Sequence, residues 1–232
     1  IAATVSILAL SFTAACGSGQ STASNSPDSD DITQQTYKPG KLTIATGQPA
    51  YEPWVMNDKP ESGEGYEAAV AYAVADKLGF KKSDVVWTRT AFDTAIAPGA
   101  KDWDFNIQQF GITDERKKAV DFSSSYYNDS QSVVVKKDSK FANATKVSDL
   151  KDATVGVMVG TLAYDYAKAN IKDDIQTFND DAALAQALDA GQIDALVTST
   201  VECVYMVQSE QVKDAKVLGR LPDSEDKSGM GI

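Results

Sequence analysis

The 232-residue sequence contains no histidine and only two cysteines, Cys16 and Cys203. Without histidine, neither a Ser-His-Asp nor a Cys-His catalytic group can be assembled. Zinc takes most of its protein ligands from cysteine and histidine, so a zinc site has too few ligands as well. Two cysteines cannot form a disulfide framework. We therefore expect a protein that is not an enzyme and that carries no metal and no cofactor.

Basic residues are also scarce, because 22 lysines and arginines stand against 33 aspartates and glutamates, a net charge of −11. Binding to nucleic acid needs a basic face for the phosphates, and no basic stripe is visible, so no nucleic-acid partner is expected. Among the acidic residues no spacing singles out a catalytic pair. The apolar fraction of 43% is that of a globular protein. With these classes excluded, the sequence predicts a folded, acidic protein whose site binds a ligand without chemical reaction.

The first fifteen residues form an apolar run that is too short to span a bilayer as a stable helix. They are typical of the h-region of a secretion signal whose beginning is truncated. The run from Thr13 to Ser18 resembles a bacterial lipobox, in which Cys16 becomes the lipidated first residue; an ordinary cleavage site with an incidental cysteine is the alternative. The polar residues that follow have nothing to bury. We expect a leader at 1–16 and a flexible tether at 17–40, anchored to the membrane by lipid.

From Lys41 onward, strand-like runs alternate with helical stretches. A helix is predicted at 66–78, ended by Gly79, and the alternation restarts after a strand-like run at 133–135. This spacing indicates βα units with parallel strand pairing, arranged as two α/β lobes. The predicted strands are 41–45, 85–88, 105–107, 154–158, 175–178, 194–197 and 216–218, and the further helices are 162–169, 182–190 and 201–207.

Arg116 is one of only three arginines in this lysine-rich chain, and it lies just after a Gly/Thr turn, Gly111-Ile112-Thr113. An arginine in this setting is a candidate for two-pronged binding of a small carboxylate, because its planar guanidinium matches the geometry of that group. The alternative is a solvated surface charge in the charged run from Asp114 to Lys118.

The segment that begins at Thr113-x-Glu115-Arg116 and continues through Val120-Asp121-Phe122-Ser123 resembles the signature of the family 3 extracellular solute-binding proteins. These are the polar amino-acid receptors of bacterial ABC importers. Further resemblances run in family order from Lys41 to Ile232. They are Lys41-Leu42-Thr43-Ile44, Tyr51-x-Pro53-Trp54, Gly65-Tyr66-Glu67, Val155-Gly156-Val157, Gly160-Thr161, Gly191-Gln192-Ile193-Asp194-Ala195 and Gly229-Met230-Gly231.

The resemblance implies an α/β fold of the two-lobed, type II periplasmic-binding-protein kind. Lobe one would span 41–132 and lobe two 133–228, with 229–232 beginning the return to lobe one, so the C-terminal part of lobe one is expected to be missing. The implied function is that of an extracytoplasmic, monomeric receptor of an ABC importer. It would bind an amino acid or a related small carboxylate between the lobes and deliver it to membrane permease subunits.

The resemblance also implies the roles of individual residues. Arg116 would take the ligand carboxylate together with backbone N–H groups of the turn from Gln109 to Gly111, where glycine permits a close approach. Across the cleft, Thr161 opens a helix whose N–H groups attract an anion, or it serves as a plain N-cap. The rings of Tyr51 and Phe92 would lie along the aliphatic part of the ligand, although a core role for Phe92 is an alternative.

One departure from the family pattern concerns the ligand. Ser199 stands where the family commonly has an aspartate that receives the α-ammonium, and a buried ammonium without a counter-charge is costly. Either Glu202 substitutes, or the ligand is not an ordinary α-amino acid. Gln48 argues mildly against a lysine- or arginine-like ligand. The rival functions are a dehydratase-like enzyme with Glu202 or Glu67 as acid or base, and the ligand-sensing module of a signalling protein.

Overall fold

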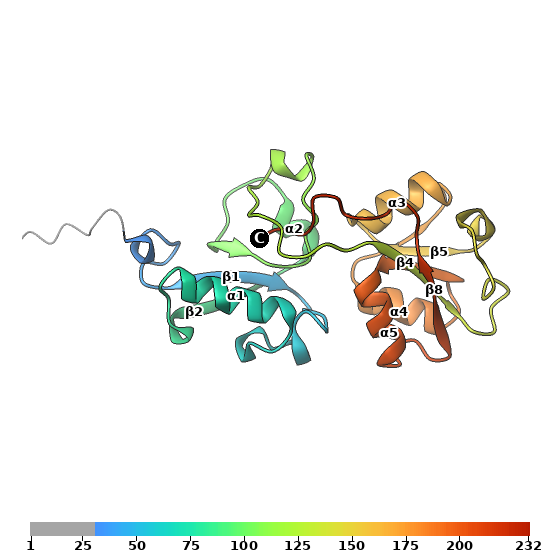
Figure 1. Ribbon diagram of the computed structural model, residues 1–232, viewed down its shortest axis with the longest axis horizontal. Coiled ribbons are helices and arrows are strands. Elements are labelled where there is room, and N and C mark those ends of the chain that lie inside the picture. Colours follow the sequence, from blue (N-terminus) through green and yellow to red (C-terminus); the bar gives the residue numbers. More distant parts are fainter. Residues whose placement is uncertain (1–30) are drawn as a thin grey trace, which may run out of the picture.

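The computed structural model describes residues 31–232 (Figure 1). The predicted leader, the lipidation site Cys16 and residues 17–30 of the predicted tether lie outside the described residues. Residues 31–40 contain a short 3-10 helix, η1 (Ile32–Gln34), and the Tyr37 N–H donates to the Asp104 carboxylate at 2.6 Å. This segment therefore contacts the folded part of the chain. No helix in the described part is long and apolar enough to cross a bilayer.

Lobe one is built on a three-stranded sheet in the order β2-β1-β3, with both pairs parallel as predicted. Its strands are β1 (Leu42–Gly47), β2 (Val85–Thr90) and β3 (Phe105–Asn106). The central strand β1 is buried at every residue. Helix α1 (Tyr66–Lys77) buries alanines three and four residues apart, which lie on one helical face and allow close packing on the sheet. Helix α2 (Phe92–Ile96) follows β2.

Lobe two holds a five-stranded sheet in the order β6-β5-β7-β4-β8. Strand β5 pairs in parallel with β6 and β7, as predicted, but β4 is antiparallel to both β7 and β8. The predicted parallel pairing is therefore wrong for β8, which pairs with β4 alone; β4 itself arrives directly from lobe one and not through a helical crossover. It inserts between β7 and β8. The strands are β4 (Gln131–Lys136), β5 (Val155–Met158), β6 (Gln176–Phe178), β7 (Ala195–Ser199) and β8 (Ala215–Arg220).

Three helices cover this sheet, α3 (Leu162–Asn170), α4 (Asp181–Asp189) and α5 (Thr200–Gln208). One apolar cluster lies under α3 and another under α4 and α5, so the sheet is buried on both faces (Figure 1). Each helix begins at a capping side chain, Thr161, Asp180 or Ser199, which accepts a backbone N–H of the first turn. The three helix N-termini follow the carboxyl ends of β5, β6 and β7, where ligands of open α/β sheets bind.

Two stretches of chain connect the lobes (Figure 1). The first leads into β4, and the second leads from β8 back to lobe one, where Met230 forms bridges with Gly111 and Tyr127. The Gly231 N–H donates to the Phe110 carbonyl at 2.9 Å. Residues 229–232 thus lie in lobe one, directly behind the Gly111 turn. The remaining short helices of the described chain are η2 (Met56–Asp58), η3 (Pro60–Ser62), η4 (Lys82–Asp84), η5 (Arg116–Lys118) and η6 (Val147–Leu150).

Candidate functional site

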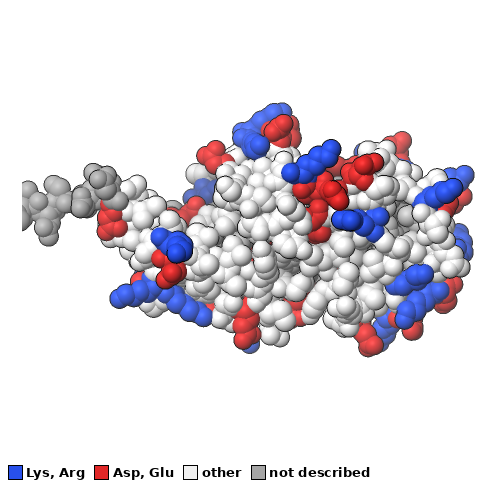
Figure 2. All heavy atoms as spheres, in the orientation of Figure 1, with Lys and Arg blue, Asp and Glu red and all other residues white. Residues whose placement is uncertain are grey.

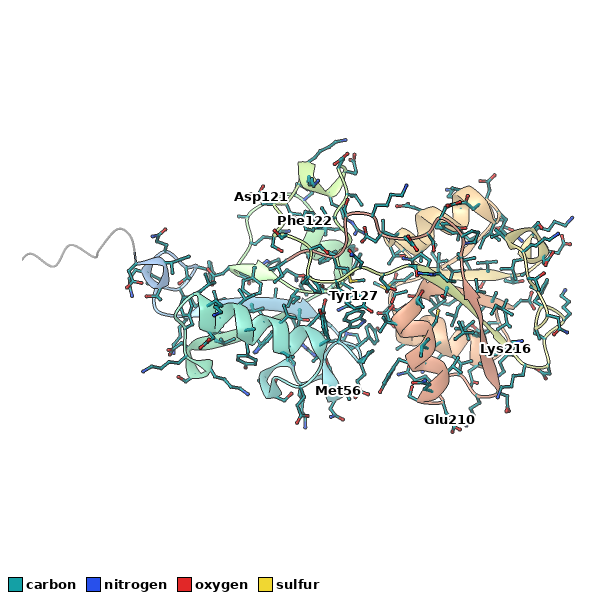
Figure 3. All side chains as sticks on the ribbon, viewed as in Figure 1. Met56, Asp121, Phe122, Tyr127, Glu210 and Lys216 are labelled. Atoms are coloured by element: carbon teal, nitrogen blue, oxygen red, sulfur yellow. The ribbon has the colours of Figure 1, made fainter. Side chains whose placement is uncertain are left out.

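A cavity lies between the two lobes and takes residues from both. All seven residues predicted to contact a ligand line it: Tyr51, Phe92, Gln109, Gly111, Arg116, Thr161 and Ser199. Figure 3 shows Tyr127 at the junction of the lobes. The residues that the sequence pattern indicates therefore lie together in this cavity, although they come from segments far apart in the chain.

Arg116 lies at the start of η5 and turns inward, unlike its neighbours. Lys117 and Lys118 form exposed ion pairs with Asp114 and Glu115. The guanidinium carbon of Arg116 instead lies 5.6 Å from the ring centre of Phe92 and 5.7 Å from that of Phe110. Burial lowers its pKa from the ordinary value, but an arginine remains charged. The alternative of a solvated surface charge is therefore wrong for Arg116.

The Arg116 guanidinium makes two hydrogen bonds to backbone carbonyls. It donates through Nη1 to the Gly111 carbonyl at 2.8 Å and through Nη2 to the Gly160 carbonyl at 2.9 Å. Gly160 belongs to lobe two, so the second bond crosses between the lobes. A guanidinium has five N–H donors in one plane, which leaves three beyond these two bonds for an anion in the cavity.

The turn at Gln109 is held by a buried glutamate, Glu67. This side chain is 0% exposed and accepts the Gln109 N–H at 2.7 Å, the Gln109 side-chain amide and the Tyr126 hydroxyl. Gln109 has a φ of 53°, an unusual value that these bonds stabilise. Burial raises the pKa of Glu67 to about 7, against the hydrogen bonds that lower it. Glu67 does not line the cavity; it positions the turn that does.

Gly111 approaches lobe two so closely that a side chain would not fit. A Cβ at this position would lie 2.6 Å from Leu162 Cδ1 and 2.7 Å from Asp226 Oδ2. Glycine is therefore required for the close approach of the lobes at this point.

We predict that Gly111→Ala weakens ligand binding by roughly tenfold or more, because the added methyl group keeps the lobes apart. The fold should tolerate the change, since the atoms it meets are the ends of side chains in lobe two and on the second connection. The double variant Gly111→Ala/Leu162→Ala removes part of the clash and should recover affinity. Isothermal titration calorimetry on the wild type, Gly111→Ala, Leu162→Ala and the double variant measures this. Additive losses in the double variant would contradict the steric explanation.

On the lobe-two side, Thr161 and Ser199 act as helix caps. Thr161 Oγ1 accepts the Tyr164 N–H at 3.2 Å and donates to the Met158 carbonyl at 2.8 Å, so its hydroxyl is already used. The N-cap alternative for Thr161 therefore holds for the side chain. Leu162 and Ala163, the first residues of α3, line the cavity and bring the helix N-terminus to it. Ser199 Oγ accepts the Glu202 N–H at 3.3 Å.

The aromatic candidates lie on the lobe-one wall. Phe92 contacts Phe110 with ring centres 4.3 Å apart, so it packs against a core residue and lines the cavity at once. The Tyr51 hydroxyl accepts the Ala182 N–H at 3.4 Å, a second bond between the lobes. Burial raises the pKa of Tyr51 well above its ordinary value, so its hydroxyl stays protonated.

Two acids that share one hydroxyl form another part of the wall. Asp181 and Glu202 are each 6% exposed, and Thr198 Oγ1 lies 3.4 Å from Asp181 Oδ1 and 2.8 Å from Glu202 Oε2. Burial raises the pKa of Asp181 to about 6; burial and the Asp181 charge raise that of Glu202. Two neighbouring buried carboxylates cannot both ionise easily, so the pair retains a proton near neutral pH. No pattern in the sequence marks Asp181, which begins α4 as an ordinary first-turn acid.

Within residues 31–232, no group of acidic or cysteine side chains could hold a metal ion. Figure 2 shows acidic and basic side chains dispersed over both lobes on the face displayed, with acidic ones gathered above their junction. No extended basic patch is visible on that face.

The model of the bacterial extracellular solute-binding proteins, family 3, matches residues 42–197. The chain is 31% identical to the L-cystine-binding protein TcyJ of Escherichia coli over 184 residues. The matched region covers 78% of this chain and 67% of that protein. A solved ancestral arginine-binding protein bound to arginine is similar with a TM-score of 0.68 and 31% identity, covering 83% of each chain.

A second solved structure is AncCDT-1, an ancestral amino acid-binding protein described as a precursor of cyclohexadienyl dehydratase. It is similar with a TM-score of 0.70 and 30% identity, covering 87% of this chain and 83% of that one. These structures share the two-lobed α/β fold described above. Because the family model matches more than half of the sequence, the protein belongs to the family 3 bacterial extracellular solute-binding proteins.

Proposed function

We propose that the protein is the extracytoplasmic receptor of an ABC importer, and that it binds an amino acid or a closely related small carboxylate between its lobes. The observation that carries this proposal is Arg116, half-buried against two aromatic rings and open to a cavity that both lobes line. The names of its relatives, an L-cystine-binding and an arginine-binding protein, support an amino-acid ligand.

In the proposed complex, the ligand carboxylate lies on the free donors of Arg116 and on the turn at Gly111. The N–H of Gln109 is already bonded to Glu67, so the amides of this turn that remain for the ligand are those after Gln109. The N-terminus of α3, beyond Thr161, faces the carboxylate from lobe two. Tyr51 and Phe92 contact the aliphatic part of the ligand, since they form the aromatic wall of the cavity.

Ligand binding favours the closed form because only that form contacts the ligand from both lobes. The Arg116 and Tyr51 hydrogen bonds across the cleft support this, since both come from residues assigned to the ligand. The closed complex then docks on membrane permease subunits as a monomer, held near the membrane through the lipidated Cys16.

A thermal-shift screen against the common amino acids tests this function. A ligand that binds only the native state at one hundred times its Kd adds about 2.7 kcal/mol of stability. For a chain of this size that raises the Tm by roughly 5–10 °C. Succinate and other small acids without an amino group serve as comparison ligands. A well-folded protein whose Tm no amino acid and no small carboxylate raises would contradict the receptor assignment.

The raised pKa of Glu202 inside the cavity supports a second candidate, a dehydratase-like enzyme in which Glu202 acts as general acid. The description of AncCDT-1 as a dehydratase precursor favours testing it. The test incubates the protein with a hydroxylated cyclohexadienyl acid and follows the absorbance of an aromatic product. Turnover that is lost in Glu202→Gln would establish the enzyme; unchanged substrate favours the receptor.

A further inference from the structure

Two aspartates, Asp129 and Asp226, lie on the two connections between the lobes, and Asp129 lies next to Ser199. We propose that Asp129, assisted by Asp226, supplies the carboxylate that binds the α-ammonium group of the ligand. This proposal rests on the proposed receptor function and specifies the ligand as an α-amino acid. Because Ser199 stands in place of the usual aspartate, a buried ammonium needs a counter-charge from another part of the fold.

Asp129 is nearly buried and only half satisfied. It is 9% exposed and lies on the connection just before β4. Its Oδ1 accepts the Ser130 N–H at 2.7 Å, whereas its Oδ2 is buried and accepts no hydrogen bond within the described chain. Asp129 lines the cavity. A buried polar atom without a partner costs about 1–3 kcal/mol, more for a charged group, and an ammonium ion in the cavity would remove this cost.

Asp226 lies on the second connection and presents a similar oxygen. Its Oδ1 accepts the N–H groups of Ser228 at 3.2 Å and Gly229 at 3.0 Å, while its Oδ2 is buried and has no partner in residues 31–232. The Asp226 N–H donates to the Asp129 carbonyl at 2.8 Å, which holds the two residues side by side. Both aspartates line the cavity, and they are close enough that, besides burial, the charge of Asp129 raises the pKa of Asp226.

The position of this pair fits an α-amino acid. Asp226 Oδ2 lies 2.7 Å from where a Cβ on Gly111 would stand, and Arg116 donates to the Gly111 carbonyl. The Asp226 carboxylate therefore adjoins the proposed site of the ligand carboxylate, and Asp129 lies next to it. In an α-amino acid the ammonium and the carboxylate are attached to the same carbon, so a ligand held by Arg116 places its ammonium in this neighbourhood.

Glu202 is less suited to the task. Its carboxylate accepts the Thr198 hydroxyl and lies in the protonated pair with Asp181. Asp129, in contrast, faces the Ser199 hydroxyl and the N–H groups of Thr200 and Val201, which counteract the rise in its pKa caused by burial. Ser199 thus keeps a role in the site, since it supports the carboxylate that replaces the aspartate of the family pattern.

The test compares Asp129→Asn with the wild type by calorimetry, using L-glutamine, L-arginine and L-cystine and the deamino analogue of each. The exposed residue Asp173 provides the matched control variant, Asp173→Asn. We expect Asp129→Asn to weaken amino-acid binding by roughly 30-fold or more, since removing one partner of a buried charge pair costs about 2–5 kcal/mol. Binding of the deamino analogues should be unchanged or tighter in this variant. Asp226→Asn should show the same pattern with a smaller loss.

The Tm of the ligand-free Asp129→Asn protein separates this role from a structural one. It should stay close to that of the wild type, because the removal of a buried charge offsets the loss of its interactions with the Ser199 hydroxyl and the Thr200 and Val201 N–H groups. Equal affinity of wild type and Asp129→Asn for the amino acids would overturn the proposal and leave the receptor function standing. So would a wild type that binds the deamino analogues as tightly as the amino acids. Wild-type protein that binds none of the common amino acids and none of their deamino analogues would overturn the proposal together with the function.

Discussion

Arg116→Lys is expected to weaken amino-acid binding by roughly 30-fold or more, and Arg116→Ala by about a thousandfold. Lysine keeps the positive charge but loses the planar pair of donors that matches a carboxylate. It also loses the flat surface that lies against Phe92 and Phe110, and its single ammonium nitrogen cannot reach the Gly111 carbonyl, the Gly160 carbonyl and a ligand at once as a guanidinium does. Alanine removes the charge as well.

Calorimetry of the variants with L-glutamine and L-arginine measures this effect. Arg220→Lys is the matched control, because Arg220 is exposed and pairs with Glu225 on the surface. The control should bind as the wild type does. If Arg116→Lys retained wild-type affinity, charge alone would account for carboxylate binding, and the two-pronged geometry would be wrong.

The helices and strands were largely predictable because each carries a local signal. Helix α1 and the strands β1 and β5 lie close to the predicted ranges, since apolar periodicity and a glycine at the helix end are properties of neighbouring residues. The antiparallel insertion of β4 was not predictable in this way. It depends on the chain crossing from one lobe to the other, and a crossing strand has the same local pattern as a strand that follows a helix.

In the candidate site too, only the residues with a local signal were predictable from the sequence. Arg116, Gly111 and Thr161 stand out by rarity or by turn chemistry, and they lie together in the cavity. Asp129 and Asp181 are two of 33 acidic residues, and no local pattern marks them, because their burial results from the packing of distant segments. The sequence also could not show that Glu67 accepts the Gln109 N–H, because 42 residues separate the two partners.

The buried glutamate Glu67 is expected to make the stability of the protein fall as the pH rises from about 4.5 to 7. Burial raises its pKa to about 7 in the fold from 4.5, so the folded state binds more protons than the unfolded state within this window. Stability from this group is fully present below the unfolded pKa and is lost as the pH rises through the folded pKa. Asp181, with a folded pKa of about 6, acts in the same direction.

Glu67→Gln isolates the contribution of this carboxyl group, because glutamine cannot titrate. At 1.36 kcal/mol for each pKa unit, the wild type should lose about 2.5 kcal/mol relative to Glu67→Gln between pH 5 and pH 8. Urea unfolding of both proteins at the two pH values gives this difference, and the cost of the altered hydrogen bonds to Gln109 and Tyr126 cancels from it. The exposed residue Glu61 provides the control, and Glu61→Gln should follow the wild type at both pH values. A difference between wild type and Glu67→Gln that stays constant with pH would mean that Glu67 is ionised in the fold; the Gln109 turn would then be held by a buried anion.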